Sequence, residues 1–262
     1  MQAEIRNRLL ERLDVVRLQP KVILDLGTGT GHAARLLQDR YRAAQVVALD
    51  VSAGMLHEAR RQRRWLRPFH RVLGDAHRLP VATESVDLLV SNLLLEWCHD
   101  PDLVFAHLCR VIRPGGLLMF TTLGPDTLLE LRDAWRRVDS ATHVHRFIDM
   151  HDLGDALLRA GFAEPVMDAE RLTVTYADLD TLVADLRATG ATNLADGRKR
   201  GLSTPRQLAA IEAGLPREAG STRLAVSVEV VYGHAWKAAT PRRDSGPRET
   251  RIPVGAIARQ RR

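Results

Sequence analysis

The chain has 262 residues, of which 45% are hydrophobic, and this favours a single globular α/β domain of ordinary composition. No apolar stretch approaches the roughly 18 residues of a membrane-spanning helix, and the first ten residues are too polar for a secretory signal. The net charge is +6, but much of it lies in an arginine-rich tail over 239–262, which we expect to be disordered. Cys98 and Cys109 are the only cysteines, and we therefore expect a reduced, cytoplasmic protein. We also expect a monomer that binds neither membranes nor nucleic acid.

The first half of the chain alternates short apolar runs with amphipathic segments. Leucines at helical spacing predict a helix over 4–16. The predicted strands are 22–26, 46–50, 69–73, 86–91 and 117–122, and the predicted helices between them are 33–37, 52–60 and 102–112. This order predicts a parallel, doubly wound sheet, whose ligands bind at the carboxyl ends of the strands.

The second half is less regular. Helices are predicted over 125–138, 153–160, 178–189 and 205–213. Residues 224–231 alternate apolar and polar side chains, which predicts a late strand with one wetter face. We interpret 1–238 as one domain, in which 125–215 forms a helical insertion or lid.

Between the first strand and the following helix stands the loop Asp25-Leu26-Gly27-Thr28-Gly29-Thr30-Gly31. Glycines let the backbone turn tightly and approach a ligand, and the helix N-terminus beyond them offers free N–H groups. A dinucleotide fingerprint would need glycine at position 32, where His32 stands. Asp25 would repel a pyrophosphate, but it suits a ligand that carries cations, such as S-adenosylmethionine (SAM).

Polar residues also end the next three predicted strands. Asp50 can accept both ribose hydroxyls, Asp75 can accept from the adenine amino group, and Asn92 stands where the sulfonium is expected. The predicted SAM-binding residues are Asp25, Gly27, Thr28, Gly29, Gly31, Asp50, Val51, Met55, Asp75, Ala76, Asn92 and Leu93.

Residues 20–125 resemble the class I SAM-dependent methyltransferases. The resemblance is carried by LDLGTGTGHAARLL, VVALDVSAGMLHEAR, GDAHRLP, SVDLLVSNLLLEWCHDP and RVIRPGGLLMFTTLGPDTL. It implies an α/β fold with a mostly parallel seven-stranded sheet, SAM as cofactor, and methyl transfer as the reaction.

The later motifs GPDTLLELRDAW, HVHRFIDMHDLGDALLRAGF, DLRATGATN and EVVYGHAWK are similar to malonyl-acyl-carrier-protein O-methyltransferases of biotin synthesis. The resemblance then covers about residues 20–238. It implies that the free carboxylate of a malonyl thioester on acyl carrier protein, an acidic partner, is methylated to prime pimeloyl and biotin synthesis. Such a carboxylate has a pKa of about 4 and is ionised at neutral pH. No general base is therefore expected, and the reaction needs positioning and water exclusion.

On the acceptor side, Arg146 is predicted to hold the malonyl carboxylate or a carbonyl, because a guanidinium binds a carboxylate at two points. Its neighbours His143, His145 and His151 read equally as capping or solvated residues. Trp97 is interpreted as a wall of the methyl-transfer site or as a core residue, and Tyr232 as a pocket or structural residue. Two groups of basic residues are candidates for docking the acidic carrier: Arg132, Arg136 and Arg137, or Arg198, Lys199 and Arg200.

Three other functions stay open at this point. A protein-modifying relative of the mitochondrial complex I assembly factors would look similar in the C-terminal region, although the absence of a transit peptide and the motif EVVYGHAWK disfavour it. The second alternative is a small-molecule or nucleic-acid methyltransferase. One that acts on adenine would be expected to carry an N/D-P-P-Y/W motif where Ser91-Asn92-Leu93-Leu94 stands, so this alternative is weakened.

The third alternative is a non-catalytic SAM-binding partner protein. The family usually has a longer N-terminal segment with an aromatic residue that helps to close the pocket, whereas Met1 lies shortly before the glycine-loop strand here. Either the start is truncated or other residues close the pocket. No metal site is expected, because Cys98, His99, His107 and Cys109 lack a paired C-x-x-C spacing.

Overall fold

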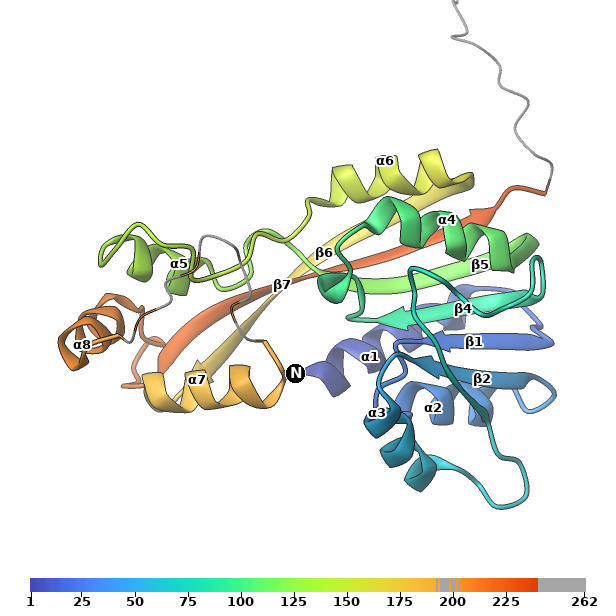
Figure 1. Cartoon of the computed structure of the whole chain (residues 1–262), viewed down its shortest axis with the longest axis horizontal. Coiled ribbons are helices and arrows are strands. Elements are labelled where there is room, and N and C mark those ends of the chain that lie inside the picture. Colours follow the sequence, from blue (N-terminus) through green and yellow to red (C-terminus); the bar gives the residue numbers. More distant parts are fainter. Residues whose placement is uncertain (192, 194–197, 199–200, 202, 240–262) are drawn as a thin grey trace, which may run out of the picture.

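One sheet of seven strands organises the part of the chain described by the structure, a computed structural model covering residues 1–239 except 192, 194–197, 199–200 and 202 (Figure 1). The strands are β1 (Val22–Leu26), β2 (Gln45–Asp50), β3 (His70–Leu73), β4 (Val86–Asn92), β5 (Ile112–Leu123), β6 (Phe162–Tyr176) and β7 (Leu224–Lys237). Their order across the sheet is β3-β2-β1-β4-β5-β7-β6.

The strands β1 to β5 pair in parallel, and only β7 runs against its two neighbours, β5 and β6. The predicted mostly parallel, doubly wound sheet is therefore confirmed. Because β1 to β4 run in the same direction, their carboxyl ends meet at one edge, and the loops that follow them lie together.

Helices cover both faces of the sheet. Successive strand residues point to opposite faces, and accordingly Leu24 and Leu118 join one buried cluster while Ile23 and Leu117 join the other. The first cluster includes side chains of α4 (Pro101–Val111) and α6 (Met150–Ala160). The second includes side chains of α1 (Gln2–Glu11) and α2 (His32–Arg40), and α3 (Ala53–Ala59) contributes Ala59 to it.

A small lobe extends from the far ends of β6 and β7 (Figure 1). It contains α5 (Leu129–Arg136), α7 (Leu179–Ala188) and α8 (Pro205–Gly214). These elements share a third cluster, separate from the other two, in which Leu131, Leu182 and Ile211 pack with Leu224 and Val226 of β7. We call this part, with the strand ends that it covers, the extension.

The predicted elements of the second half need correction. The range 125–215 is not helical throughout, because it contains the 15-residue strand β6. This strand lies at the edge of the sheet, and most of its residues are exposed or half-buried, so apolar and polar residues alternate clearly only near its end, over 172–176. The late strand β7 is also longer than predicted. Residues 240–262, where a disordered tail was predicted, lie outside the described residues.

Among the described residues, no helix combines the length and apolarity needed to cross a membrane.

The predicted first helix ends at Glu11 and continues as the short 3-10 helix η1 (Arg12–Val15). Two further 3-10 helices matter for the site: η2 (Arg60–Gln62) follows α3, and η3 (Leu95–Trp97) follows β4.

Candidate active site

The glycine loop joins β1 to α2 and is fixed by its own backbone. Gly27 and Thr28 both donate their N–H groups to Leu49 O of β2, at 2.9 and 3.0 Å. Gly31 is the N-cap of α2 with φ +82°, and a Cβ there would lie 2.9 Å from the Cβ of Ala59 and 3.1 Å from the ring of Phe69. Only glycine meets both conditions, because positive φ is unfavourable for other residues.

Asp50, at the end of β2, ties this loop to the start of α3. Its Oδ2 accepts from the N–H of Gly29 and its Oδ1 accepts from the N–H of Ser52, both at 2.8 Å. A carboxylate has about four lone-pair positions, so both oxygens keep capacity for the two hydroxyls of a ribose.

Asp25 is only 1% exposed, and it acts within the loop. The hydroxyl of Thr28 donates to its Oδ2 at 2.5 Å. Burial raises the pKa of Asp25 to about 6, although the bonds from Thr28 and the N–H of Ala34 oppose the shift. The acidic residue before the loop therefore braces the loop from inside and does not line the cavity beside it.

A cavity of about 270 Å³ opens at the carboxyl edge of the sheet, beside the loop. Its walls come from the ends of β1, β2 and β3 and from the segment after β4. Five of the predicted SAM-binding residues line it: Gly27, Asp50, Val51, Asp75 and Ala76. The other predicted residues do not: Asp25, Thr28, Gly29, Gly31, Met55, Asn92 and Leu93.

Asp75 organises one side of this cavity together with two histidines that sequence reasoning missed. Its Oδ1 accepts from the N–H of His77 at 2.9 Å and contacts His77 Nδ1 at 3.0 Å. These two bonds lower the pKa of Asp75. The ring of His77 stacks on that of His99 with centroids 4.0 Å apart. His77 Nε2 is buried without a hydrogen-bond partner among the described residues, although the residue lines the cavity.

Trp97 separates the cavity from the extension. It lines the cavity and is 59% exposed, so the prediction of a wall residue agrees with its position. A Cβ at Gly190, just after α7, would lie 3.2 Å from its ring. Neighbouring Cys98 also lines the cavity, and burial raises the pKa of its thiol to about 11. Cys98 is therefore a neutral thiol here.

Asn92 and Leu93 turn toward β5. Thr121 Oγ1 donates to Asn92 Oδ1 at 3.0 Å and accepts from the N–H of Leu93 at 3.0 Å. Leu93 adopts φ +53°, and the reversal carries the chain to Leu94, which lines the cavity. Met55 lies exposed on α3.

Glu96, in η3, was not predicted as a site residue. Its Oε1 accepts from the N–H of Leu123 at the end of β5, at 2.8 Å. Its Oε2 is buried and has no partner among the described residues. Burial raises the pKa of Glu96 to about 7, which places a titrating carboxyl next to Trp97.

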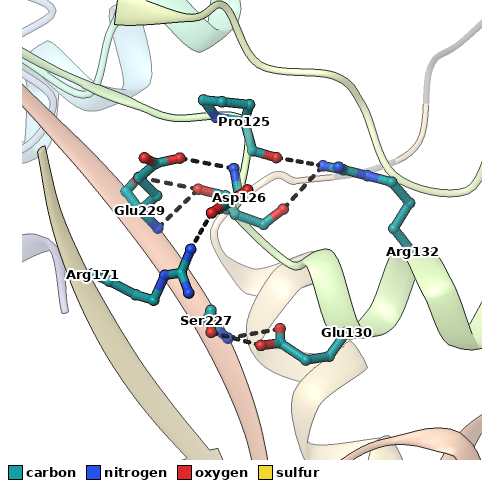
Figure 2. A network of polar contacts seen from close by, with 8 residues as sticks. Pro125, Asp126, Glu130, Arg132, Arg171, Ser227 and Glu229 are labelled. Carbon is teal, nitrogen blue, oxygen red and sulfur yellow. Dashed lines mark hydrogen bonds and ion pairs between the residues drawn. The ribbon is translucent and has the colours of Figure 1, made fainter.

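Figure 2 shows the polar network that fastens the segment after β5 onto β7. Asp126 donates its N–H to Glu229 Oε2 at 2.8 Å, and its carboxylate pairs with Arg171 of β6. Gly124 passes so close that a Cβ there would lie 2.4 Å from the carboxylate of Glu229. The start of the extension is thus anchored beside the carboxyl edge of the sheet.

The same network orients α5. Glu130 accepts from the N–H and hydroxyl of Ser227, at 2.9 and 2.6 Å, and Arg132 donates to the carbonyl of Pro125 at 3.0 Å (Figure 2). Arg132 is therefore half-buried and structural, which weakens the predicted docking face on α5. Arg136 pairs with Asp133 and is exposed.

The predicted acceptor residues are not gathered around the cavity. Arg146 is exposed and does not line the cavity, and it makes no hydrogen bond or ion pair with any described residue. His143 stacks on Trp135 at 3.5 Å and bonds to Asp139, so it supports the extension. Tyr232 is buried beneath the guanidinium of Arg12 and does not face the cavity.

The structure describes only some of the remaining candidates. His151 bonds to Asp149 at the start of α6, in a capping position. Lys199 and Arg200 lie outside the described residues, whereas Arg198 is described. No group of three or more His, Cys, Asp or Glu residues within the described part of the chain is placed to hold a metal ion.

Comparison with known proteins agrees with this geometry. A family model described as "Methyltransferase domain" matches residues 24–120. The YcgJ protein of Bacillus subtilis shares the fold, with a TM-score of 0.64 and 14% identity over 88% of this chain and 98% of that one. Phosphoethanolamine N-methyltransferase 2 of Haemonchus contortus, solved in complex with SAM, matches with a TM-score of 0.55 and 15% identity over 89% of this chain and 52% of that one.

The sheet order, the glycine loop and the strand-end carboxylates define a class I SAM-dependent methyltransferase. Malonyl-[acyl-carrier protein] O-methyltransferases of Halorhodospira halophila and Laribacter hongkongensis are 46% and 49% identical to the chain. The two alignments cover 100% and 93% of this chain, and 90% and 85% of those proteins. The chain belongs to the malonyl-[acyl-carrier protein] O-methyltransferase family.

Proposed function

We propose that the protein transfers a methyl group from SAM to the free carboxylate of a malonyl thioester carried by acyl carrier protein. The observation that supports the acceptor most directly is the 46% sequence identity, over the whole chain, to a relative named malonyl-[acyl-carrier protein] O-methyltransferase. The methyl ester would enter pimeloyl and biotin synthesis, and we propose a monomeric enzyme of the cytoplasm.

The residues around the cavity suit SAM. Asp50 offers spare acceptor capacity for the ribose, and Asp75 and the unpartnered His77 Nε2 offer polar contacts to the adenine. Gly27 lets the loop pass close to Leu94, because a Cβ at this position would lie only 2.9 Å from the Leu94 side chain. Asp25, Thr28, Gly29 and Gly31 would act indirectly by shaping the loop, and Met55, Asn92 and Leu93 would border the bound cofactor.

When bound, SAM supplies a methyl group on a positively charged sulfur, and the acceptor carboxylate is already a nucleophile. The protein then needs no base, only alignment of the acceptor and exclusion of water. Trp97 would close the cavity toward the extension, and neutral Cys98 adds no competing charge. Arg146, which is exposed and makes no ion pair with any described residue, is our candidate for holding the acceptor carboxylate or carbonyl.

Two other functions are less well supported. The full-length relatives named as malonyl-carrier methyltransferases disfavour both a complex I assembly factor and a non-catalytic SAM-binding protein.

The experiment is transfer of labelled methyl from SAM to malonyl-acyl carrier protein, compared with malonyl-CoA and free malonate. Label on the carrier, released by mild base as expected for a methyl ester, supports the proposal. If the label stays in SAM with every malonyl acceptor, the proposed function is wrong.

A further inference from the structure

The segment between α3 and β3 has an unusual composition. Residues 60–71 hold six arginines and no acidic residue. In the middle of this run, Trp65 and Leu66 are 95% and 83% exposed. A large, exposed aromatic side chain flanked in the sequence by arginines is the combination that protein interfaces favour at their centres.

A second cavity, of about 400 Å³, opens between this segment, α1 and α2. Four arginines line it: Arg6, Arg35, Arg61 and Arg63. Asp39 is the one acidic side chain of its lining, and Arg35 and Arg64 already bind it, at 2.8 and 2.9 Å. The cavity therefore has a net positive charge. We call this cavity, with residues 60–67, the arginine surface.

Several of these arginines lack a partner that would neutralise them. Arg60 and Arg63 make no ion pair with any residue that the structure describes. Arg6 donates only to its neighbour Asn7. Burial, followed by the charges of Arg63 and Arg60, lowers the pKa of Arg71. Crowded, unpaired guanidinium groups repel one another, and an acidic partner would relieve this repulsion.

We call the cavity beside the glycine loop, in which we propose that SAM binds, the SAM cavity. The arginine surface begins close to it. Val51 lines that cavity and is separated from α3 only by the N-cap Ser52, and the seven residues of α3 span about 10 Å before Arg60. On the other side, His32 lines the arginine cavity and directly follows Gly31 of the glycine loop. A protein docked here would lie near the cavity beside the glycine loop.

We infer that the arginine surface is the docking site for the acidic face of the carrier protein that brings the malonyl group. This inference rests on the proposed function for the identity of the partner. Trp65 and Leu66 supply the apolar contact, and Arg60, Arg61 and Arg63 pair with carboxylates of the carrier. The proposed acceptor is carried by an acidic protein, and this favours a protein over nucleic acid or a lipid surface as the occupant.

The test compares two acceptors with the full-length enzyme: malonyl-acyl carrier protein and the small thioester malonyl-N-acetylcysteamine, which has no acidic protein attached. The variants are Arg61→Glu/Arg63→Glu and Trp65→Ala. Arg17→Glu, an exposed arginine before β1, is the matched control. We expect the charge-reversal variant to raise KM for the carrier-bound acceptor about tenfold or more at low salt, with a smaller effect at high salt. KM for the small thioester should not change.

An unchanged KM for the carrier-bound acceptor would overturn the inference. So would an equal rise for both acceptors, or an equal rise with Arg17→Glu. Loss of binding to RNA or to anionic vesicles, with carrier kinetics intact, would assign the surface to another partner and overturn it too. If the wild type methylates no malonyl acceptor, the proposed function fails, and direct titration with acyl carrier protein still decides the inference. Binding that the charge reversal abolishes would support docking, and absent binding would refute it.

Discussion

Two regions of the molecule differ in whether their charged side chains already have partners. Around the SAM cavity, the carboxylates of Asp25, Asp50 and Asp75 are already bound by backbone N–H groups or a neighbouring hydroxyl. Arg146, between α5 and α6, and the arginines of residues 60–63, after α3, are exposed, and Arg60, Arg63 and Arg146 make no ion pair with any residue that the structure describes. The proposed cofactor would thus meet polar groups that are already fixed, whereas the proposed acceptor and its carrier would meet exposed charges that they neutralise on binding.

Replacing Asp50, one of these fixed carboxylates, should have the largest effect, which we expect in SAM affinity. In Asp50→Ala, the ribose loses its acceptor and the N–H groups of Gly29 and Ser52 lose theirs. We expect SAM affinity to fall about 100-fold, or about 3 kcal/mol, as measured by calorimetric titration. The SAM affinity of Asp50→Asn, which keeps one acceptor oxygen, should lie between those of wild type and Asp50→Ala. A SAM affinity of Asp50→Ala within threefold of wild type would contradict the proposed role of Asp50 in cofactor binding.

A pair of glycines separates crowding from backbone strain. Gly31 and Gly115 both have positive φ, +82° and +75°, but a Cβ would meet neighbours only at Gly31. We expect Gly31→Ala to cost about 3 kcal/mol and Gly115→Ala about 1 kcal/mol in the free energy of unfolding, measured with urea. Equal losses would mean that the close approach of Gly31 to Ala59 is not rigid.

Replacing Arg146 should change the kinetics with the acceptor and should not change cofactor binding. We expect Arg146→Ala to raise KM for malonyl-acyl carrier protein about tenfold, or about 1.4 kcal/mol, while SAM affinity stays the same. Arg136→Ala, an exposed arginine in the extension, serves as the control and should leave KM unchanged. Loss of SAM binding in Arg146→Ala would show that Arg146 is structural.

The smallest expected effect concerns pH. Glu96 has an ordinary pKa of 4.5, and burial raises it to about 7 in the fold. Its neutral form therefore supports stability fully below pH 4.5, and this contribution is lost as the pH rises through 7. Wild type should lose about 1 kcal/mol more than Glu96→Gln between pH 6 and pH 7, measured by thermal unfolding at each pH. Asp25, shifted in the same direction to about 6, leaves part of the slope in both proteins. Parallel pH profiles would show that Glu96 is ionised in the fold.

Most of the parallel half could be predicted because β1, β2, β4 and β5 are largely buried and form apolar runs, such as Val22–Leu26. The edge strand β6 has no such run, and it was missed. The carboxylates at the ends of β2 and β3 follow directly from the strand order. The contact between His77 and His99 does not, because it depends on how the loops after β3 and β4 meet. Likewise, Asp25 looked like a ligand contact, and only its burial beside Thr28 shows that it braces the loop.

The position of β7 affects the order in which the protein can fold during synthesis. This strand comes last among the seven in the chain, yet it lies between β5 and β6 and pairs with both. Until residues 224–237 leave the ribosome, β5 has an open edge and β6 has no partner. Such long-range pairing is slow to form, and open edges invite association with other chains. The glycine-loop half can therefore assemble early, whereas the extension waits for the final strand.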